Sequence, residues 1–351
     1  MRFKKLLIII LIGMAFILFT YFNANSVEER GKTEKQEEVT PQKEMIIPPE
    51  VSKVFDENVL TRQPRKDIPI TYARTLYLPS IQNKLHTVFL FKMKNSDLGF
   101  QEKIEPFEII PAEQEEPRVS SKMLTVNLNV FLRFYRLEGD NIKEILEEIY
   151  LPVSLEEEKE SFNPEEENIY TIAYVLPPGN YLLALAVTST GLIKIGTLYS
   201  EFSLPDPLSF ERKLETTPIF FVKSIKQISQ PETKVKIHRN SFYYSILQME
   251  PKIENIFSPT DTPEIFYYIF GAKPVKPGTR KYNIEIKYIV KKGAEEVIKF
   301  AQKYTAPLIS HPLPLSFQEK KLDPGKYTLE IEITENVSNL STKKEVNFII
   351  K

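Results

Sequence analysis

One stretch of sequence occurs twice in this chain of 351 residues. The segments 176–204 and 322–350 align without a gap, so that Tyr327 follows Tyr181 by 146 positions. Each copy reads as a Pro-Gly turn, a strand that begins with tyrosine, a polar turn and a final strand. A segment that recurs at the spacing of a whole domain indicates tandem domains of one fold.

Apolar and polar residues alternate along the segments 126–134, 282–290 and 327–333. Such alternation is typical of antiparallel strands that have one face against a core. Turn residues separate the segments, which favours a β-sandwich. The chain is therefore expected to be all-β, with two tandem immunoglobulin-like antiparallel β-sandwich domains, at 67–207 and 208–351.

Three segments leave alternatives open. The return arms after the turns at 138–141 and 291–293 fit helical spacing as well as a strand. Both arms follow a hairpin-like turn at matching positions of the repeat, and this favours strands. The segment 218–226 is expected to be either the first strand of the second domain or a hydrophobic part of the connector.

The motif Leu-x-Pro-Gly-x-Tyr occurs once in each copy, with Gly179 before Tyr181 and Gly325 before Tyr327. Proline followed by glycine suits a type II turn, because glycine accepts a positive φ. The tyrosine ring is expected to enter the core while its hydroxyl bonds backbone across the corner, as in the tyrosine corner of immunoglobulin-like sandwiches. These four residues are therefore predicted to have structural roles.

Three basic residues near the N-terminus, Arg2, Lys4 and Lys5, precede an uninterrupted apolar run at 6–22. A charged start before apolar residues is the layout of a secretory signal. The run is longer than a typical signal core and shorter than a full membrane span. Residues 1–26 are thus expected to be either a cleaved signal peptide or a retained transmembrane anchor. In both cases the rest of the chain is extracytoplasmic, in the periplasm or at the cell surface.

Charged and polar residues dominate the segment 27–66, which also holds a short apolar piece at 45–47. This composition predicts a disordered charged spacer between the N-terminal segment and the folded domains. The formal net charge of the whole chain is −1, so charge gives no reason to expect a nucleic-acid partner. Cysteine is absent, which excludes disulfides, thiolate metal sites and cysteine catalysis.

No catalytic or cofactor motif stands out in the sequence. The three histidines, His86, His238 and His311, lie far apart along the chain, and neither a serine-nucleophile elbow nor a phosphate-binding glycine loop occurs. The glutamate runs 156–158 and 165–167 could supply oxygen ligands to calcium, but they lack the spacing of a calcium loop and are typical of solvated loops. We expect no enzyme, no cofactor and no metal; the alternative is an enzyme whose site is assembled from distant Glu, Asp and His residues.

The segment 266–270 is aromatic or aliphatic at every position and therefore apolar on both faces. It is expected to be either an inner strand covered on both faces or an exposed aromatic face that binds a glycan or a protein. A second aromatic pair, at 243–244, belongs to the same argument. The candidate partner-binding or glycan-binding residues are Tyr243, Tyr244, Phe266, Tyr267 and Tyr268.

The order of these elements resembles the tandem immunoglobulin-like region of bacterial GWxTD-domain and von Willebrand factor A-like secreted proteins. The segments that carry the resemblance are LPPGNYLLALAV, SEFSLPDPLSF, FYYSILQMEPKIENIFSPTDTPEIFYYIFGAKP and LDPGKYTLEIEI. The chain contains no tryptophan and hence no GWxTD motif, and it has no DxSxS motif of metal-dependent adhesion. What the resemblance implies is an extracytoplasmic, β-rich protein.

These features together favour a non-enzymatic interaction or scaffold protein of the bacterial envelope. Its expected partner is another envelope or secreted protein, and residues 6–22 would hold it in the membrane if they are not cleaved. The alternative is a carbohydrate-binding protein that uses an exposed aromatic sheet face.

Overall fold

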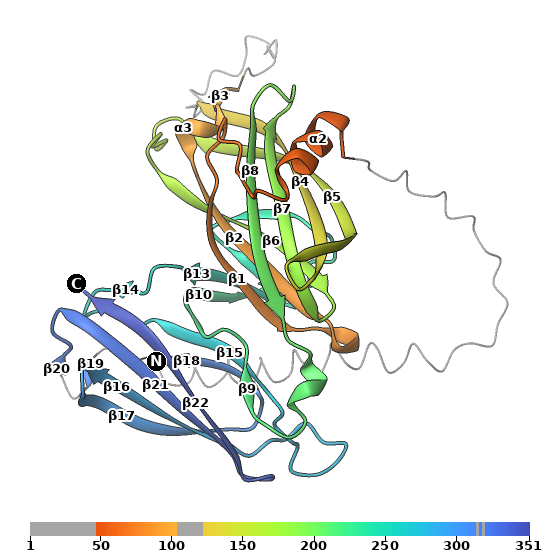
Figure 1. Ribbon diagram of the computed structural model, residues 1–351. Helices are drawn as coiled ribbons and strands as arrows, with labels where there is room; N and C mark the ends of the chain where they lie inside the picture. The colour runs from red at the N-terminus through yellow and green to blue at the C-terminus, as the bar shows by residue number, and fades with distance from the viewer. Residues whose placement is uncertain (1–46, 104–121, 314–315, 318–319) are drawn as a thin grey trace, which may run out of the picture. The chain divides into compact units, whose positions relative to one another are not determined.

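The computed structural model describes residues 47–103, 122–313, 316–317 and 320–351 (Figure 1). The expected signal or anchor at 1–26 lies outside the described residues. The chain divides into two compact units, each of which is described by itself. The described residues of the first unit fall within 47–206 and 235–242, and those of the second unit fall within 207–234 and 243–351.

The first unit is a β-sandwich of two antiparallel sheets. One sheet has the strand order β1-β2-β6-β11 and comprises β1 (Thr71–Pro79), β2 (Leu85–Lys94), β6 (Glu167–Leu176) and β11 (Ile237–Arg239). The other has the order β5-β4-β7-β8 and comprises β4 (Met123–Glu138), β5 (Asn141–Glu158), β7 (Gly179–Ser189) and β8 (Ile195–Leu204), with β3 (Gln101–Glu102) also paired with β4. The ring of Phe89 on β2 lies 5.4 Å from that of Phe134 on β4 and 5.0 Å from that of Phe202 on β8. The alternating apolar residues of both sheets therefore meet in one core.

The second unit repeats this arrangement. One sheet has the order β12-β13-β10-β15-β18 and comprises β10 (Phe220–Gln227), β12 (Phe242–Tyr244), β13 (Leu247–Lys252), β15 (Glu264–Phe270) and β18 (Leu308–Pro312), with β9 (Glu215–Thr216) also paired with β15. The other has the order β14-β22-β21-β16-β17 and comprises β14 (Ile256–Phe257), β16 (Ile284–Lys292), β17 (Glu295–Tyr304), β21 (Gly325–Glu335) and β22 (Leu340–Ile350). A small hairpin joins β19 (Ser316–Phe317) to β20 (Lys320–Lys321), and β14 runs parallel to β22. Buried residues of both larger sheets, such as Tyr267 and Tyr288, share one hydrophobic core.

Helical structure is sparse in the described part of the chain. The helical segments are α2 (Pro49–Asn58), α3 (Asn95–Leu98), η1 (Ile81–Asn83) and η2 (Pro207–Phe210). Over the residues described, no helix is long and apolar enough to span a bilayer. The prediction of an all-β, largely antiparallel sandwich fold is thus confirmed.

The sequence repeat corresponds to equivalent strands in the two units. Strands β2, β4, β5, β6, β7 and β8 have the same order and sheet positions as β15, β16, β17, β18, β21 and β22. The ambiguous return arms are strands, β5 and β17, and the segment 218–226 contains strand β10. Long pairing with a neighbouring strand, sixteen residue pairs for β4 with β5, overrides the helical spacing of the isolated arm.

Both Pro-Gly motifs lead into the strand that follows a crossing between sheets. Tyr181 Oη donates to the carbonyl of Pro177 and Tyr327 Oη donates to that of Asp323, each at 2.7 Å. This is the bond to backbone that a tyrosine corner requires. The glycines differ from the type II expectation: Gly179 and Gly325 have φ values of 152° and 153°, far from the value of about 80° for that turn. Each glycine is already paired as the first residue of its strand, so the backbone is extended there.

The segment 47–66 differs from the disordered spacer that its composition predicts. Helix α2 lies within it, and Val51 and Phe55 of that helix are fully buried. After the helix, the backbone around Lys66 pairs with Gly196 of β8, where a Cβ would overlap the carbonyl of Ile68. Local composition did not reveal this order, because the apolar residues of α2 are few and are buried only by a distant part of the chain.

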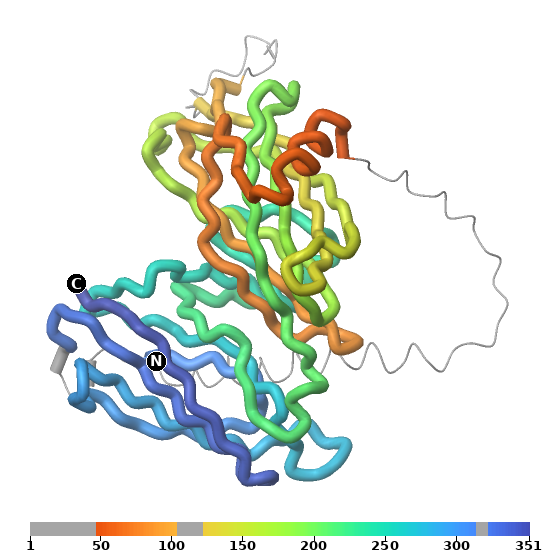
Figure 2. Tube along the Cα trace, viewed as in Figure 1, coloured from red at the N-terminus to blue at the C-terminus, as the bar shows by residue number. Residues whose placement is uncertain are grey.

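The first unit runs to Asp206, and the stretch 235–242 also belongs to it. Figure 2 shows the trace of this stretch among the strands of the first unit. There β11 pairs with β6, with Arg239 opposite Tyr170. Asn240 accepts from the backbone N–H of Ile169 and donates its own N–H to the carbonyl of the same residue. The chain thus returns to the first sandwich after its second unit has begun.

The two tyrosine corners lead to a first prediction. Tyr181→Phe and Tyr327→Phe each remove one corner hydroxyl and should each lower the free energy of unfolding by about 1 kcal/mol, since a backbone carbonyl loses its hydrogen-bond donor. Urea unfolding measures this loss. Tyr72→Phe is the control, because that hydroxyl bonds Thr75 at an exposed site and its loss should be close to neutral. Equal effects at all three positions would contradict a stabilising role of the corner.

Candidate protein-binding face

The first unit carries an apolar surface on the outside of its β5-β4-β7-β8 sheet. Successive strand residues point to opposite faces, and on β4 and β7 both faces are buried. The outward residues are Phe131 and Tyr135 on β4 and Leu182, Ala184 and Ala186 on β7, all less than a tenth exposed. They form, with helix α2, a hydrophobic cluster distinct from the core between the sheets. This surface, with α2 on it, is called the helix-covered face below (Figure 1).

Helix α2 fits this surface because apolar residues recur every four positions within it and just beyond each of its ends. Ile47, Val51, Phe55 and Val59 are buried against the sheet, whereas Lys53 and Glu57 on the opposite side are exposed and pair with each other. Residues four apart lie on one side of a helix, so the stripe faces the sheet along its full length. Pro49 occupies the first helical position, where no intrahelical N–H bond is lost.

Arg133 is the one charged side chain buried in the described part of this face. It projects from β4, and its guanidinium donates to Asp56 at 2.7 Å and to Ser52 at 2.8 Å, both on α2. It also donates to Glu148 on β5 at 2.5 Å and lies over the ring of Phe55. Arg133 therefore ties the helix to two strands at once.

Arg133 remains positively charged in the folded protein. Burial acts to lower the pKa of the guanidinium, but the hydrogen bond to Tyr135 and the ion pair with Glu148 outweigh it, and the pKa is raised. The Tyr135 hydroxyl has a raised pKa, chiefly because it is buried. A buried arginine with its donors satisfied is stable, whereas an unpaired one would be costly.

The equivalent face of the second unit is charged instead of apolar. At the repeat spacing of 146, Glu330 stands where the first unit has Ala184, and Glu332 stands where it has Ala186. Glu330 is nearly buried between Lys291 and Lys343, whose ammonium groups each lie 2.7 Å away. Hydrogen bonds from these lysines lower the pKa of Glu330. An apolar helix on the charged face of the second unit would leave carboxylates unpaired, which is costly. The apolar face of the first unit can be covered by a helix without this cost.

The aromatic residues expected to form a binding face lie elsewhere in the second unit. Phe266 and Tyr267 are fully buried and Tyr244 nearly so, while Tyr243 and Tyr268 are partly exposed. Of the two alternatives left open by the sequence, these three residues fit the covered strand and not the exposed aromatic face. Strand β15 is paired with β10 on one edge and with β18 on the other. On one face Phe266 contacts Phe220, and on the other face Tyr267 enters the core.

A chain of tyrosine hydroxyls lies in the second unit beside His311. The Tyr288 hydroxyl is 3.4 Å from that of Tyr267 and 3.0 Å from that of Tyr304. The His311 ring stacks on Tyr288 at a centroid distance of 5.0 Å. Burial lowers the pKa of His311 to about 4 and raises the pKa values of the three tyrosines. All four groups are therefore neutral near pH 7, and the cluster is a packed polar chain rather than an acid–base pair.

The remaining candidates from the sequence are dispersed. His86 and His238 lie on β2 and β11 of the first unit, and His311 lies on β18 of the second. The glutamate runs are matched by cations in the pairs Lys103–Glu156, Arg239–Glu157, Lys94–Glu165 and Lys92–Glu167. Across the residues that the structure describes, no group of three His, Cys, Asp or Glu side chains is arranged to hold a metal ion.

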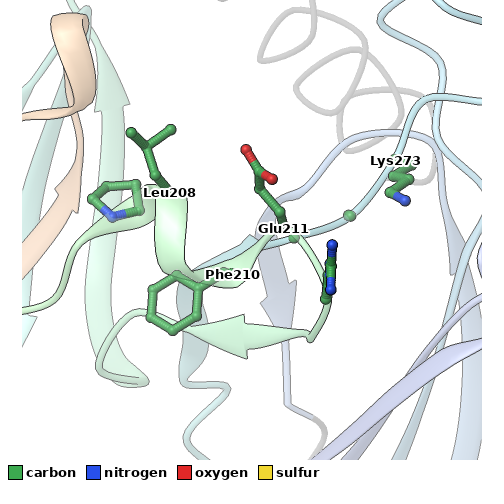
Figure 3. Close-up of a pocket in the computed structure, with 8 residues that line it drawn as sticks. Leu208, Phe210, Glu211 and Lys273 are labelled. Carbon is green, nitrogen blue, oxygen red and sulfur yellow. The ribbon is translucent and has the colours of Figure 1, made fainter.

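A shallow pocket of about 430 Å³ lies within the second unit (Figure 3). Its lining comes from two segments, 207–212 and 271–273, and includes Leu208, Phe210, Glu211 and Lys273. The ring of Phe210 stacks on Phe270, so this side chain is fixed by packing. The eight lining residues contain one carboxylate and no histidine or serine, and so no nucleophile–base pair.

No protein-family model matches this chain, and no curated protein shows significant sequence similarity to it. The candidate site therefore depends on the geometry described above.

The sequence reasoning missed the helix-covered face, although two signals were present. The run LLALAV on β7 is apolar at consecutive positions, which is typical of a strand covered on both faces. Within the charged segment 27–66, apolar residues recur at intervals of four from Ile47 to Val59, which is typical of an amphipathic helix.

The bonds of Arg133 lead to a second prediction. Arg133→Met keeps most of the apolar stem but removes the bonds to Asp56 and Ser52, so local opening of α2 should become easier by about 2 kcal/mol. Hydrogen exchange of the amides in 49–58 measures this opening. Arg62→Met is the control, because its ion pair with Glu201 is exposed and contributes little. Unchanged exchange in Arg133→Met would show that packing alone holds the helix.

The lowered pKa of His311 leads to a third prediction. In the unfolded chain His311 is protonated near its ordinary pKa of 6.5, whereas in the folded chain its pKa is about 4. The free energy of unfolding associated with neutral His311 is therefore fully present above pH 6.5 and is lost as the pH falls toward 4. His311→Phe keeps a ring on Tyr288 without the titration and should show a smaller loss across that window. Urea unfolding at a series of pH values tests this. Phe300→Leu, which alters the same ring cluster without removing a titrating group, should retain the slope of the unaltered chain.

Proposed function

We propose that this protein is a non-enzymatic interaction or scaffold protein of the bacterial envelope. It is built from two immunoglobulin-like domains and is exported by its N-terminal segment, which either is cleaved or remains as an anchor. Its partner is another envelope or secreted protein. The helix-covered face of the first unit is the observation that carries this proposal.

The immunoglobulin-like assignment is supported by topology and by the corners. Each unit sets β5-β4-β7-β8 or its equivalent against a sheet containing β2 and β6 or their equivalents. In each, a tyrosine at the start of the strand after a crossing bonds the backbone four residues upstream, through Tyr181 or Tyr327. Many sandwiches serve in recognition, but the fold alone does not define a function.

The helix-covered face has the composition of a binding hot spot, and a partner contacts it when α2 leaves it. Tyrosine and arginine dominate the energetics of protein interfaces, and here Tyr135 and Arg133 lie beside Phe131 under an amphipathic helix. An amphipathic helix in an apolar groove is a recurrent mode of protein recognition. The charged face at the same position of the second unit indicates that this surface is a specialised feature of one copy.

The glycan-binding alternative is less well supported. Three of its five proposed residues, Tyr244, Phe266 and Tyr267, are buried and cannot stack on a sugar. Only Tyr243 and Tyr268 keep partial exposure. An enzyme assembled from distant residues is no better supported, because the described pocket lacks a paired acid and base.

A pull-down from solubilised envelope tests the proposal and gives a fourth prediction. The tagged full chain should recover a specific protein, and Ala186→Glu should lose it, because a carboxylate on this apolar face is left unpaired when a partner covers it. Glu332→Ala, at the same repeat position of the second unit, is the matched control and should retain the partner. Recovery of no protein by the unaltered chain, together with a freely diffusing monomer, would refute the proposed function.

A further inference from the structure

Helix α2 is held on the helix-covered face by side chains alone. In the described part of the chain, no backbone–backbone hydrogen bond joins α2 to the sheet. The bonds that reach the sheet come from Arg133 to Ser52 and Asp56, and from Tyr199 Oη to the carbonyl of Val54 at 3.3 Å. The helix can therefore leave the face without breaking any strand pairing.

The helix depends on this face for its own stability. It has ten residues, and no side chain caps its N-terminus. Isolated helices of fewer than about 12 residues are marginal in water, so most of the stability of α2 comes from packing. A detached α2 is therefore stabilised when it packs on any face that has the same residues.

The connector between α2 and the sandwich has the features of a hinge. Leu60 is 76% exposed, and Arg62 has a φ of 53°, which non-glycine residues rarely adopt. Beyond it the chain is firmly fixed, since Arg65 and Thr197 exchange two hydrogen bonds and Asp67 accepts from the N–H of Ile195. Short hinges under strain favour exchange of the attached element, because an extended hinge relieves the strain.

We propose that α2 is exchanged between two copies of this chain, so that the α2 of each copy covers the face of the other. Such a dimer keeps each contact described above, including those of Arg133 with Ser52 and Asp56, and differs only in the hinge. The six residues 59–64, when extended, reach about 20 Å. A second copy of this chain fits the helix-covered face, because its α2 has the same residues as the helix that already packs there.

This inference rests on the proposed function in one respect: retention at the membrane would supply the high local concentration of copies that exchange needs. The exchanged and closed forms have the same contacts, so their balance depends on how often two copies meet. An N-terminal anchor would confine the copies to one membrane plane and favour exchange.

The absence of cysteine from the chain allows a test free of background cross-links. Two differently tagged full-length copies are co-expressed, one with Ser52→Cys and the other with Glu148→Cys, and treated with a flexible bis-maleimide. Both altered positions bond Arg133, so they are close only when α2 of one copy lies on the face of the other. A cross-linked dimer carrying both tags is the expected result.

The matched control uses Lys223→Cys in one copy and Glu250→Cys in the other. These side chains bond at 2.7 Å across β10 and β13, which are not expected to exchange. A copy carrying both Ser52→Cys and Glu148→Cys shows that this pair reacts. If that copy cross-links within itself while the mixed single variants give no more dimer than the control, the exchange is refuted.

Variants of the hinge provide a second readout. Arg62→Gly removes the strain of the closed hinge and should lower the yield of mixed dimer about fivefold. Arg62→Ala loses the same ion pair with Glu201 but keeps the strain, and should leave the yield near that of the unaltered hinge. Equal yields from both variants would exclude hinge strain as the cause of exchange. A pull-down that still recovers another protein when no mixed dimer forms would leave the proposed function standing and overturn only the exchange.

Discussion

The corner made by Tyr181, and again by Tyr327, is the interaction on which both sandwiches depend. Each hydroxyl bonds a carbonyl four residues upstream, and each ring stacks on a phenylalanine of the last strand, Phe202 or Phe348, at 5.3 and 5.5 Å. One side chain thus fixes where the chain enters its strand and joins that strand to its neighbour through the core. The shared pattern Leu-x-Pro-Gly-x-Tyr thus occurs at the same place in both sandwiches.

The two copies differ where the core is not involved. Inward residues are apolar in both units, whereas the outward positions carry Ala184 and Ala186 in one and Glu330 and Glu332 in the other. Small apolar side chains allow a helix to approach, and carboxylates paired with lysines favour contact with water. One fold consequently carries an apolar surface covered by a helix in its first copy and a charged surface in its second.

Much of the candidate site could not be predicted, because its parts are distant in sequence. Arg133 reads as a polar residue on the outward face of an alternating strand, and only the structure brings Ser52, Asp56 and Glu148 to its guanidinium. Strand β11 likewise pairs with β6, although β9 and β10 of the second unit precede β11 along the chain. Conversely, the run from Phe266 to Phe270 left open whether its rings are buried, and the neighbouring strands decided that.

The sequence alone determined the all-β class and the equivalence of the two copies, because period-two alternation and a gapless repeat depend only on local order. It also indicated the tyrosine corners, since turn, ring and hydroxyl lie within a few residues. Tertiary structure decided what covers each outward face, which chain segment completes each sheet and which aromatic rings reach water. These features depend on contacts between distant residues, and a pattern within one segment does not specify its partner.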